Sequence, residues 1–289
     1  MKTIRSLFNR EDTAGIMFTL PFTLGFLFFM IVPMGISLYY SFCKYNILSP
    51  PVFTGLDNFK NMIADGTFLQ TIKVTFFFAF VSVPLKLIFA LLVAMLLLKN
   101  TKMSGIYRAA YYLPSIIGGS VAVAILWKRM FAMDGVVNKL LGSIGIKTSI
   151  SWLGDTKTAI WILILLAVWQ FGSSMLIFLS SLKQIPTSLY EAAMVDGANP
   201  VSRFFKITLP LLTPTIFFNL VMQMINGFMV FNSGYIITGG KPLNSTLFYA
   251  LYLYEKAFTD YDMGYACAMA WVLLIVVSII TASIYWIYS

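Results

Sequence analysis

Histidine is absent from this chain of 289 residues, and charged residues make up only 11% of it. The first absence removes the commonest metal ligand and proton shuttle in proteins. The second argues against a water-soluble fold, because ordinary soluble domains carry about 25% charged residues. Cysteine is scarce too, and we expect Cys43 and Cys267 to pack as small apolar side chains. Hydrophobic residues reach 59%, so the composition indicates a polytopic membrane protein.

Long apolar runs recur along the chain. A membrane-spanning helix needs about 20 apolar residues. By that rule the sequence predicts one transmembrane domain over residues 1–289 with six spans, at about 14–40, 71–98, 109–127, 158–182, 207–237 and 266–288. The first run is too long for the core of a signal peptide, so we expect it to be retained. The predicted fold class is all-α, a bundle of six transmembrane helices.

Aspartate and glutamate are missing from all six predicted spans. Without them, no carboxylate pair, metal cluster or catalytic triad can assemble in the membrane. The acidic relay that is typical of proton- or sodium-coupled carriers is missing as well. Gly239-Gly240-Lys241-Pro242 is no phosphate-binding loop, since Tyr235 stands at the first glycine position and Pro242 replaces Ser or Thr. We therefore expect no enzyme activity, no metal and no cofactor bound by this chain.

Basic residues outnumber acidic ones, 20 to 11, and the net charge is +9. Because they lie mostly in short connections beside apolar runs, we expect contacts with anionic lipid headgroups and none with nucleic acid. If the N-terminus is cytoplasmic, the inner segments hold Lys2, Arg5, Arg10, Lys99, Lys102, Arg108, Lys183, Arg203 and Lys206. The outer segments hold a similar number, but they are longer. The density of basic residues therefore weakly favours a cytoplasmic N-terminus.

One polar, charged segment, residues 183–206, lies between two long apolar runs. Ser188 and Glu191 have the spacing of a capping box, in which the side chain of each residue accepts a hydrogen bond from the backbone N–H of the other. Ala192 and Ala193 favour continuation of that helix. The first half of the segment is predicted to be a short helix exposed to water.

A second short helix is predicted in the same segment. Gly197 can end the first helix by adopting a positive φ. Asn199 and Pro200 then suit the N-cap and the first position of the next helix.

The segment also resembles a family signature. Glu191-Ala192-Ala193 followed by Gly197, Ile207 and Leu209-Pro210 closely resembles the EAA loop of permease subunits of binding-protein-dependent ABC importers. Residues 53–59 and 237–246 resemble loops of the maltose, lactose and glycerol-3-phosphate type, so the likeness extends over most of the chain. Lys241 departs from that type, because it interrupts a Gly-Gly-Pro sequence.

This resemblance implies a function and a set of partners. It implies the transmembrane subunit of an ATP-driven importer in the bacterial plasma membrane, forming the path for a sugar or oligosaccharide brought by an extracellular solute-binding protein. The implied partners are a second homologous permease and two ATPase subunits, which bind ATP-Mg. The EAA loop then becomes a cytoplasmic coupling helix. Its implied ATPase-coupling residues are Glu191, Ala192, Ala193, Asp196, Gly197, Arg203 and Lys206.

Neutral polar side chains mark a candidate substrate path inside the predicted spans: Asn226, Gln223, Asn219, Asn232, Gln170, Ser173 and Ser174. Amides and hydroxyls can hydrogen-bond a polyhydroxylated solute without the desolvation cost of a charge. Asn219, Gln223 and Asn226 have i, i+4, i+7 spacing and share one helix face, so as a set they predict a lined pathway. Each one singly is better explained by hydrogen bonding between helices. The family resemblance implies a sugar contact at Asn226.

Lys86 is the lone charge well inside a predicted span. Two positions for its ammonium stay open. The side chain can snorkel to the outer headgroups, or it can face the cavity in a functional role.

Two alternatives to the sugar importer also stay open. One is a secondary carrier or channel that works without an ATPase. The other is an ABC importer for a non-sugar polar solute such as glycerol-3-phosphate.

Overall fold

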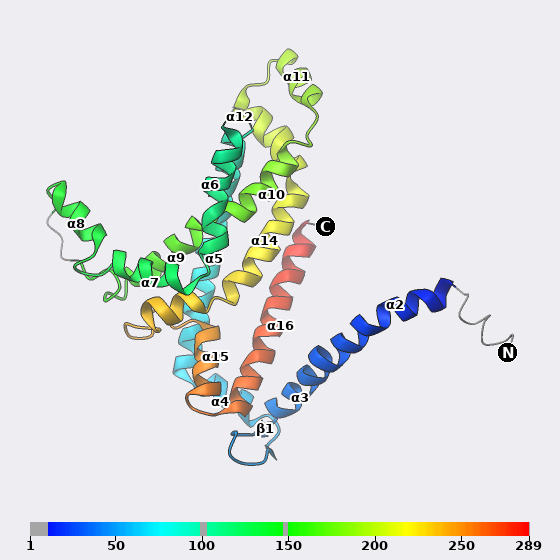
Figure 1. Ribbon diagram of the computed structural model, residues 1–289, viewed down its shortest axis with the longest axis vertical. Coiled ribbons are helices and arrows are strands. Elements are labelled where there is room, and N and C mark those ends of the chain that lie inside the picture. Colours follow the sequence, from blue (N-terminus) through cyan, green and yellow to red (C-terminus); the bar gives the residue numbers. More distant parts are fainter. Residues whose placement is uncertain (1–10, 99–102, 147–149, 289) are drawn as a thin grey trace. The chain divides into compact units, whose positions relative to one another are not determined.

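The computed structural model describes residues 11–98, 103–146 and 150–288. Helices dominate these residues (Figure 1), and they fall into two compact units. The smaller unit contains the described residues up to Ala64 together with Glu255–Leu273. The larger unit contains Asp65–Tyr254 and the described residues from Leu274 onward. Of the predicted inner charges, Lys2, Arg5, Arg10, Lys99 and Lys102 lie outside the described residues.

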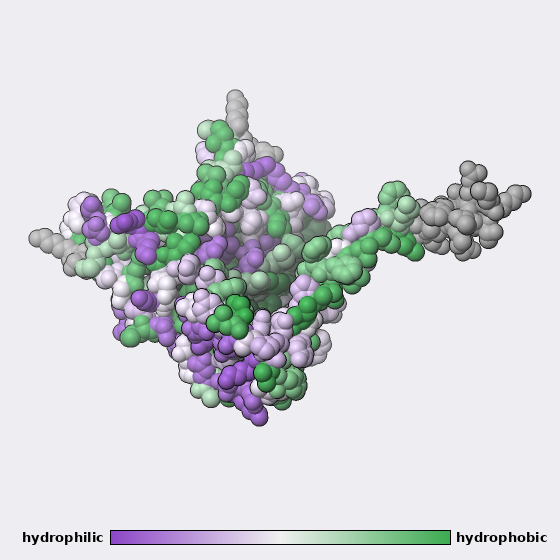
Figure 2. All heavy atoms as spheres, turned by 60° about the horizontal axis from the view of Figure 1, so that its bottom comes forward, coloured by the Kyte–Doolittle hydropathy of each residue, from purple (hydrophilic) through white to green (hydrophobic). Residues whose placement is uncertain are grey.

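The smaller unit begins with a long apolar helix. It is built from α2 (Glu11–Phe26), the π-helical segment η1 (Leu27–Ile31) and α3 (Val32–Ser41). Its Gly15–Ser41 portion covers the run predicted as the first span and is long and apolar enough to cross a membrane, and the most apolar window of that portion is unburied within the chain. Figure 2 shows the resulting hydrophobic surface along this helix. Such a surface suits lipid or another membrane subunit.

A short antiparallel pair follows, in which β1 (Cys43–Lys44) lies beside β2 (Val52–Phe53). The next element is α4 (Asp57–Ala64), whose Asn58 amide donates to the carbonyls of Ser41 and Cys43, both at 2.9 Å. These two hydrogen bonds fix the end of α3 against α4.

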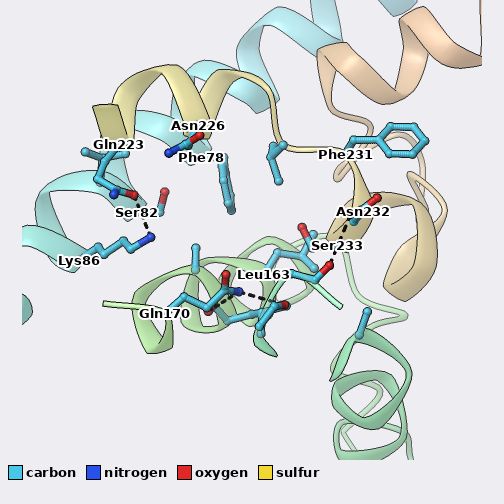
Figure 3. Close-up of a pocket in the computed structure, with 18 of the residues that line it drawn as sticks. Phe78, Ser82, Lys86, Leu163, Gln170, Gln223, Asn226, Phe231, Asn232 and Ser233 are labelled. Carbon is cyan, nitrogen blue, oxygen red and sulfur yellow. Dashed lines mark hydrogen bonds between the residues drawn. The ribbon is translucent and has the colours of Figure 1, made fainter. Parts of the chain in front are cut away.

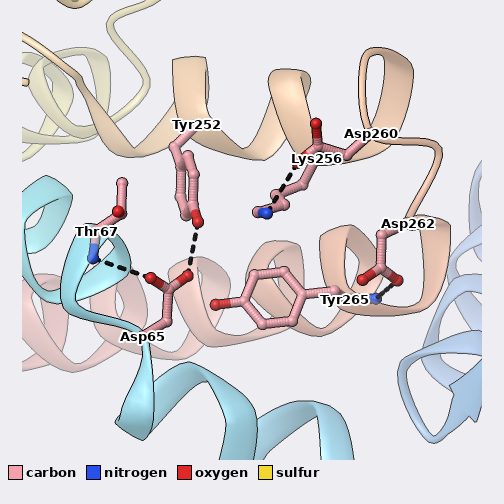
Figure 4. Close-up of polar contacts among 7 residues, drawn as sticks. All are labelled: Asp65, Thr67, Tyr252, Lys256, Asp260, Asp262 and Tyr265. Carbon is pink, nitrogen blue, oxygen red and sulfur yellow. Dashed lines mark hydrogen bonds and ion pairs between the residues drawn. The ribbon is translucent and has the colours of Figure 1, made fainter.

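The same unit includes the turn that leads into α16 (Met263–Tyr288). In this turn Lys256 pairs with Asp260 at 2.8 Å, and the Asp262 carboxylate accepts the N–H of Tyr265 at 3.3 Å (Figure 4). The carboxylate of Asp262 therefore satisfies one of the N–H groups that a helix start leaves free.

The larger unit is built around α5 (Gly66–Leu96), against which α9 (Ala159–Trp169), α10 (Gly172–Leu182) and α14 (Thr213–Phe228) pack. Its core includes the buried ring of Phe78 and the fully buried rings of Phe178, Phe228 and Phe248. Asp65 caps α5, because its carboxylate accepts the Thr67 N–H at 2.9 Å and also the Tyr252 hydroxyl at 2.6 Å (Figure 4).

Three helix pairs in this unit are bent at a short break. They are α6 (Ser104–Ile117) with α7 (Val121–Met130), bent by 97°, α9 with α10, bent by 41°, and Pro200–Leu211 with α14, bent by 66°. Within the described residues, Gly15–Ser41, Gly66–Leu96 and Met263–Trp286 are single helices long enough to span a membrane, and the count reaches six when each bent pair is one span. The prediction of a single domain stays a prediction.

The breaks lie inside three of the predicted spans, which the sequence predicts as continuous helices. The run at 109–127 is interrupted at Gly118-Gly119-Ser120, where Ser120 caps α7 by accepting the Val123 N–H. The run at 158–182 is interrupted after Trp169, and the run at 207–237 leaves its helix at Phe228. Hydropathy could not show these breaks, because apolar residues stand on both sides of each. Three further elements are α8 (Val136–Ser143), η3 (Gly234–Thr238) and α15 (Tyr249–Phe258).

Candidate functional site

A cavity of about 360 Å³ opens in the larger unit where the helices break. It is lined by α5, α9 and α14 and by the interrupted segments at 118–120 and 230–233 (Figure 3). Gly118 is required there, because a Cβ at this position would collide with the Gln170 side chain and with the Pro114 carbonyl. Gln170 in turn donates to the carbonyls of Gly118 at 3.4 Å and Leu166 at 3.3 Å. The helix breaks thus supply both the space and the polar backbone of this cavity.

Lys86 faces this cavity. Its ammonium, on α5, donates to the Gln223 side-chain oxygen, on α14, at 2.8 Å. Figure 3 shows the two side chains pointing toward each other, with Ser82 and Asn226 close by. The sequence left two positions open for the Lys86 ammonium, at the outer headgroups or in the cavity. In the structure the ammonium lies at the cavity.

Four of the predicted path residues line the cavity: Gln170, Gln223, Asn226 and Asn232. Asn219, Ser173 and Ser174 do not. Asn219 lies one turn before Gln223 on α14 and is only 1% exposed, with its amide donating to the Thr215 carbonyl at 3.1 Å. Helical spacing correctly placed Asn219 on one face with Gln223, but the cavity does not extend that far along the helix.

The two serines are used in packing. The Ser173 N–H donates to Ser115 Oγ at 2.9 Å, which joins α10 to α6. Ser174 is fully buried. Neither side chain lines the cavity, so a pathway role for them, and for Asn219, gains no support from their position.

Sequence reasoning missed two cavity hydroxyls, on Ser82 and Ser120. Ser120 alone carried a signal, because a serine after two glycines inside an apolar run is a candidate N-cap at a helix break. Ser82 lies within an uninterrupted apolar helix and gave none.

The segment predicted as two short helices contains α11 (Thr187–Val195), α12 (Pro200–Arg203) and the π-helical η2 (Phe204–Thr208), which continues into α13 (Leu209–Leu211). The capping box is wrong. α11 starts two residues earlier than a Ser188 cap requires, and its N-cap, Pro186, makes no side-chain hydrogen bond. Proline sets its own φ near the helical value, so it can lead into a helix without a capping hydroxyl.

The other two signals in this segment are confirmed. Gly197 has φ +75°, and the N–H groups of Gly197 and Ala198 donate to the carbonyls of Met194 and Ala193 at 3.1 and 2.8 Å. This is the Schellman arrangement that ends a helix. Asn199 caps α12 by accepting the Ser202 N–H at 2.7 Å, with Pro200 at the first position.

Most predicted coupling residues are exposed: Glu191, Ala192, Asp196, Gly197 and Lys206, with Ala193 and Arg203 partly covered. They share this surface with large apolar side chains that the sequence reasoning did not single out, Leu189, Met194, Val195, Val201 and Phe205. Val195 is 89% exposed and Phe205 60%. Apolar groups exposed together with charged ones are typical of a protein interaction surface. In Figure 1, α11 lies at one extremity of the larger unit, beyond α10 and α14.

Comparison with known proteins decides the family. Residues 61–289 match the family described as "Binding-protein-dependent transport system inner membrane component". The chain belongs to this family. This permease is 54% identical over 296 residues to the "Probable ABC transporter permease protein YesP" of Bacillus subtilis (strain 168), with 100% of this chain and 96% of that protein covered. It is thus a multi-pass inner-membrane transport subunit.

Two further similarities extend this result. The permease is 31% identical over 270 residues to the "Probable starch degradation products transport system permease protein AmyD" of Thermoanaerobacterium thermosulfurigenes, covering 92% of this chain and 90% of the other. Its fold matches a chain of a bacterial ABC transporter involved in the import of the acidic polysaccharide alginate, with a TM-score of 0.83 at 23% identity over 100% and 98% of the two chains. The all-α fold predicted from the sequence is confirmed as that of an ABC importer permease.

Proposed function

We propose that this permease forms the translocation path for a sugar or oligosaccharide in an ATP-driven importer. The solute is delivered by an extracellular binding protein, and the energy comes from two ATPase subunits that bind ATP-Mg. A second homologous permease completes the path. The sugar is supported by the name of the relative AmyD and by the neutral amides of Gln170, Gln223 and Asn226 around the cavity, which suit a polyhydroxylated solute.

One observation supports a coupling between α11 and the cavity. The exposed helix α11 is joined to η2 by a hydrogen bond of 2.8 Å between the hydroxyls of Tyr190 and Thr208. From η2 the chain runs through α13 into α14, which places Gln223 and Asn226 at the cavity. A displacement of α11 by an ATPase subunit therefore has a short covalent and hydrogen-bonded route to the groups that line the path.

The mechanism that fits this route is alternating access. Closure of the two ATPase subunits on ATP moves α11 as a lever, and α14 with its bent partner segment changes the side from which the cavity is open. Release of ADP and phosphate reverses the movement. This assignment requires α11, and with it the N-terminus, to be cytoplasmic. A carrier or channel that works alone has no use for so exposed a surface on α11 and α12.

The test is ATPase activity of the permease co-expressed with its genomic neighbours and placed in nanodiscs, with and without the neighbouring binding protein and a panel of oligosaccharides. We expect stimulation that needs both the binding protein and one of the sugars. If no ATPase co-purifies and the permease alone carries flux in liposomes, the proposal is wrong.

A further inference from the structure

Among the described residues that line the cavity, Lys86 is the one ionisable side chain. The other lining groups are amides, hydroxyls, glycines and apolar side chains. Resting on the proposed sugar path, we infer that this cavity takes an acidic sugar, an oligosaccharide whose carboxylate binds the Lys86 ammonium.

The Lys86 charge has no carboxylate to neutralise it in the part of the chain that the structure describes. Its hydrogen-bond partner is the neutral side-chain oxygen of Gln223, at 2.8 Å. Two ion pairs, Lys60 with Asp57 and Lys256 with Asp260, belong to the smaller unit, whereas Lys86 is in the larger one. The sequence agrees, since residues 66–133, which include the whole of α5, contain neither Asp nor Glu.

A charged lysine inside a membrane helix is unfavourable for insertion unless the charge has a partner or a function. A charged side chain near the centre of a membrane helix makes insertion of that helix less favourable, and long side chains usually avoid this cost by snorkelling to the headgroups. Lys86 instead extends to α14, across the cavity edge (Figure 3). A neutral sugar gains little from the ammonium that an amide would not give. A carboxylate forms a charge-assisted hydrogen bond, about twice as strong as a neutral one.

The geometry leaves room for such a ligand. An ammonium has three donor hydrogens, and one is directed at Gln223. The others remain for a solute carboxylate, while the amides of Gln170, Asn226 and Asn232 and the hydroxyl of Ser82 can bind sugar hydroxyls. The volume of about 360 Å³ falls within the range of small-ligand sites.

The experiment measures binding-protein-dependent uptake and ATPase stimulation by the assembled importer in proteoliposomes. The probes are di- and trisaccharides of galacturonate, glucuronate and mannuronate, each paired with its neutral methyl ester, together with neutral oligosaccharides and glycerol-3-phosphate. The variants are Lys86→Met, Lys86→Arg and Lys73→Met. Lys73 lies on the same helix but is exposed and does not line the cavity, so its variant controls for loss of one positive charge from α5.

We expect one of the acidic sugars to be imported, and Lys86→Met to lower that import about 10- to 100-fold, the range set by the loss of a hydrogen bond to a charged group. Lys86→Arg should restore most of the import, and Lys73→Met should leave it unchanged. Co-purification of the partner subunits with each variant shows that the complex has assembled.

Four results would overturn the inference. Import of neutral oligosaccharides but of no acidic sugar would refute it and leave the sugar importer standing. Equal losses for an acid and its ester in Lys86→Met would show that the lysine acts on structure. Import of glycerol-3-phosphate alone would show that the ammonium binds a phosphate, and it would refute the proposed sugar path as well. If none of the probes is imported, both the acidic sugar and the sugar path are refuted.

Discussion

The hydroxyls of Tyr190 and Thr208 lie 2.8 Å apart, although eighteen positions separate them in the chain. Tyr190 is on the exposed helix α11, and Thr208 is buried at the end of η2. The remainder of α11 and the turn after it are largely exposed. This hydrogen bond therefore links the helix expected to meet an ATPase to the segment that continues through α13 into α14, the helix that reaches the cavity.

Replacing Tyr190 by Phe removes this bond and keeps the ring. We expect a complete complex with a few-fold lower solute-stimulated ATPase activity and import. The reason is that losing the hydrogen bond, worth about 1 kcal/mol net, weakens the link between α11 and η2. Thr208→Val should have the same effect. In the double variant the losses should not add, because both changes break one bond. Additive losses in this cycle would show that the two hydroxyls act separately.

Gly197 tests the turn at the end of α11. Its φ of +75° favours glycine, and no atom lies within 4 Å of a Cβ built there. Asn and Asp both tolerate this backbone conformation, so they separate charge from strain. We expect Gly197→Asn to keep substantial import and Gly197→Asp to abolish it, because the new charge lies at the end of an exposed helix whose C-terminus already carries partial negative charge.

Import by the assembled complex is the measurement for this pair, with co-purification of the ATPase as the control for assembly. Normal import by Gly197→Asp would remove α11 from the coupling surface. Equal inactivity of both variants would point to the backbone rather than to the charge.

Asp65 accepts hydrogen bonds from the Thr67 N–H and from the Tyr252 hydroxyl. Asp65→Ala should lower the stability of the complex by about 0.5–2 kcal/mol, the usual cost of a lost N-cap. Asp65→Asn should cost less, because the amide oxygen can still accept the Thr67 N–H. Thermal unfolding followed by the loss of monodisperse complex measures both. A drop for Asn as large as that for Ala would show that the charge, and not the cap, stabilises this end of α5.

The sequence predicted much of this structure because its strongest signals are local. Gly197, Asn199 and Pro200 act within a few residues of themselves, and the structure places each as expected. The apolar runs are equally local, since the membrane requires their length. What could not be predicted depends on neighbours far away in the chain. Whether Lys86 snorkels or reaches Gln223, 137 positions further on, is decided by the packing of α14 on α5.

The helix breaks belong to the same class of missed features. Gln170 is a polar residue within a long, mostly apolar run, so the run alone gave no sign of a break there. Its carbonyl accepts a hydrogen bond from Ser115 Oγ, and its side-chain amide donates to the Gly118 carbonyl, both on the preceding bent pair. Asn219 shows the converse, because its helix face was correct while the extent of the cavity was not. Spacing assigns a residue to a face, but the position of a cavity along that face depends on the packing of the other helices.

Gly172 offers the sharpest test of that packing. A Cβ there would collide with the Tyr111 carbonyl and would lie 2.7 Å from the Tyr112 Cα. Both are backbone atoms of α6, so no side chain can move aside. Gly172→Ala should therefore separate α10 from α6, at an overpacking cost of about 1–3 kcal/mol, and should lower import because Gln170 moves with α10.

Gly105, on α6, is the matched control, since nothing lies within 4 Å of a Cβ built at this position. At a position whose backbone conformation alanine can adopt, replacing Gly by Ala stabilises a protein by about 0.4–1 kcal/mol, because it lowers the conformational entropy of the unfolded chain. The two Gly→Ala changes should thus shift the unfolding temperature of the complex in opposite directions, down for Gly172 and slightly up for Gly105. Equal shifts would mean that α6 and α10 are not in the close contact on which the shape of the cavity depends.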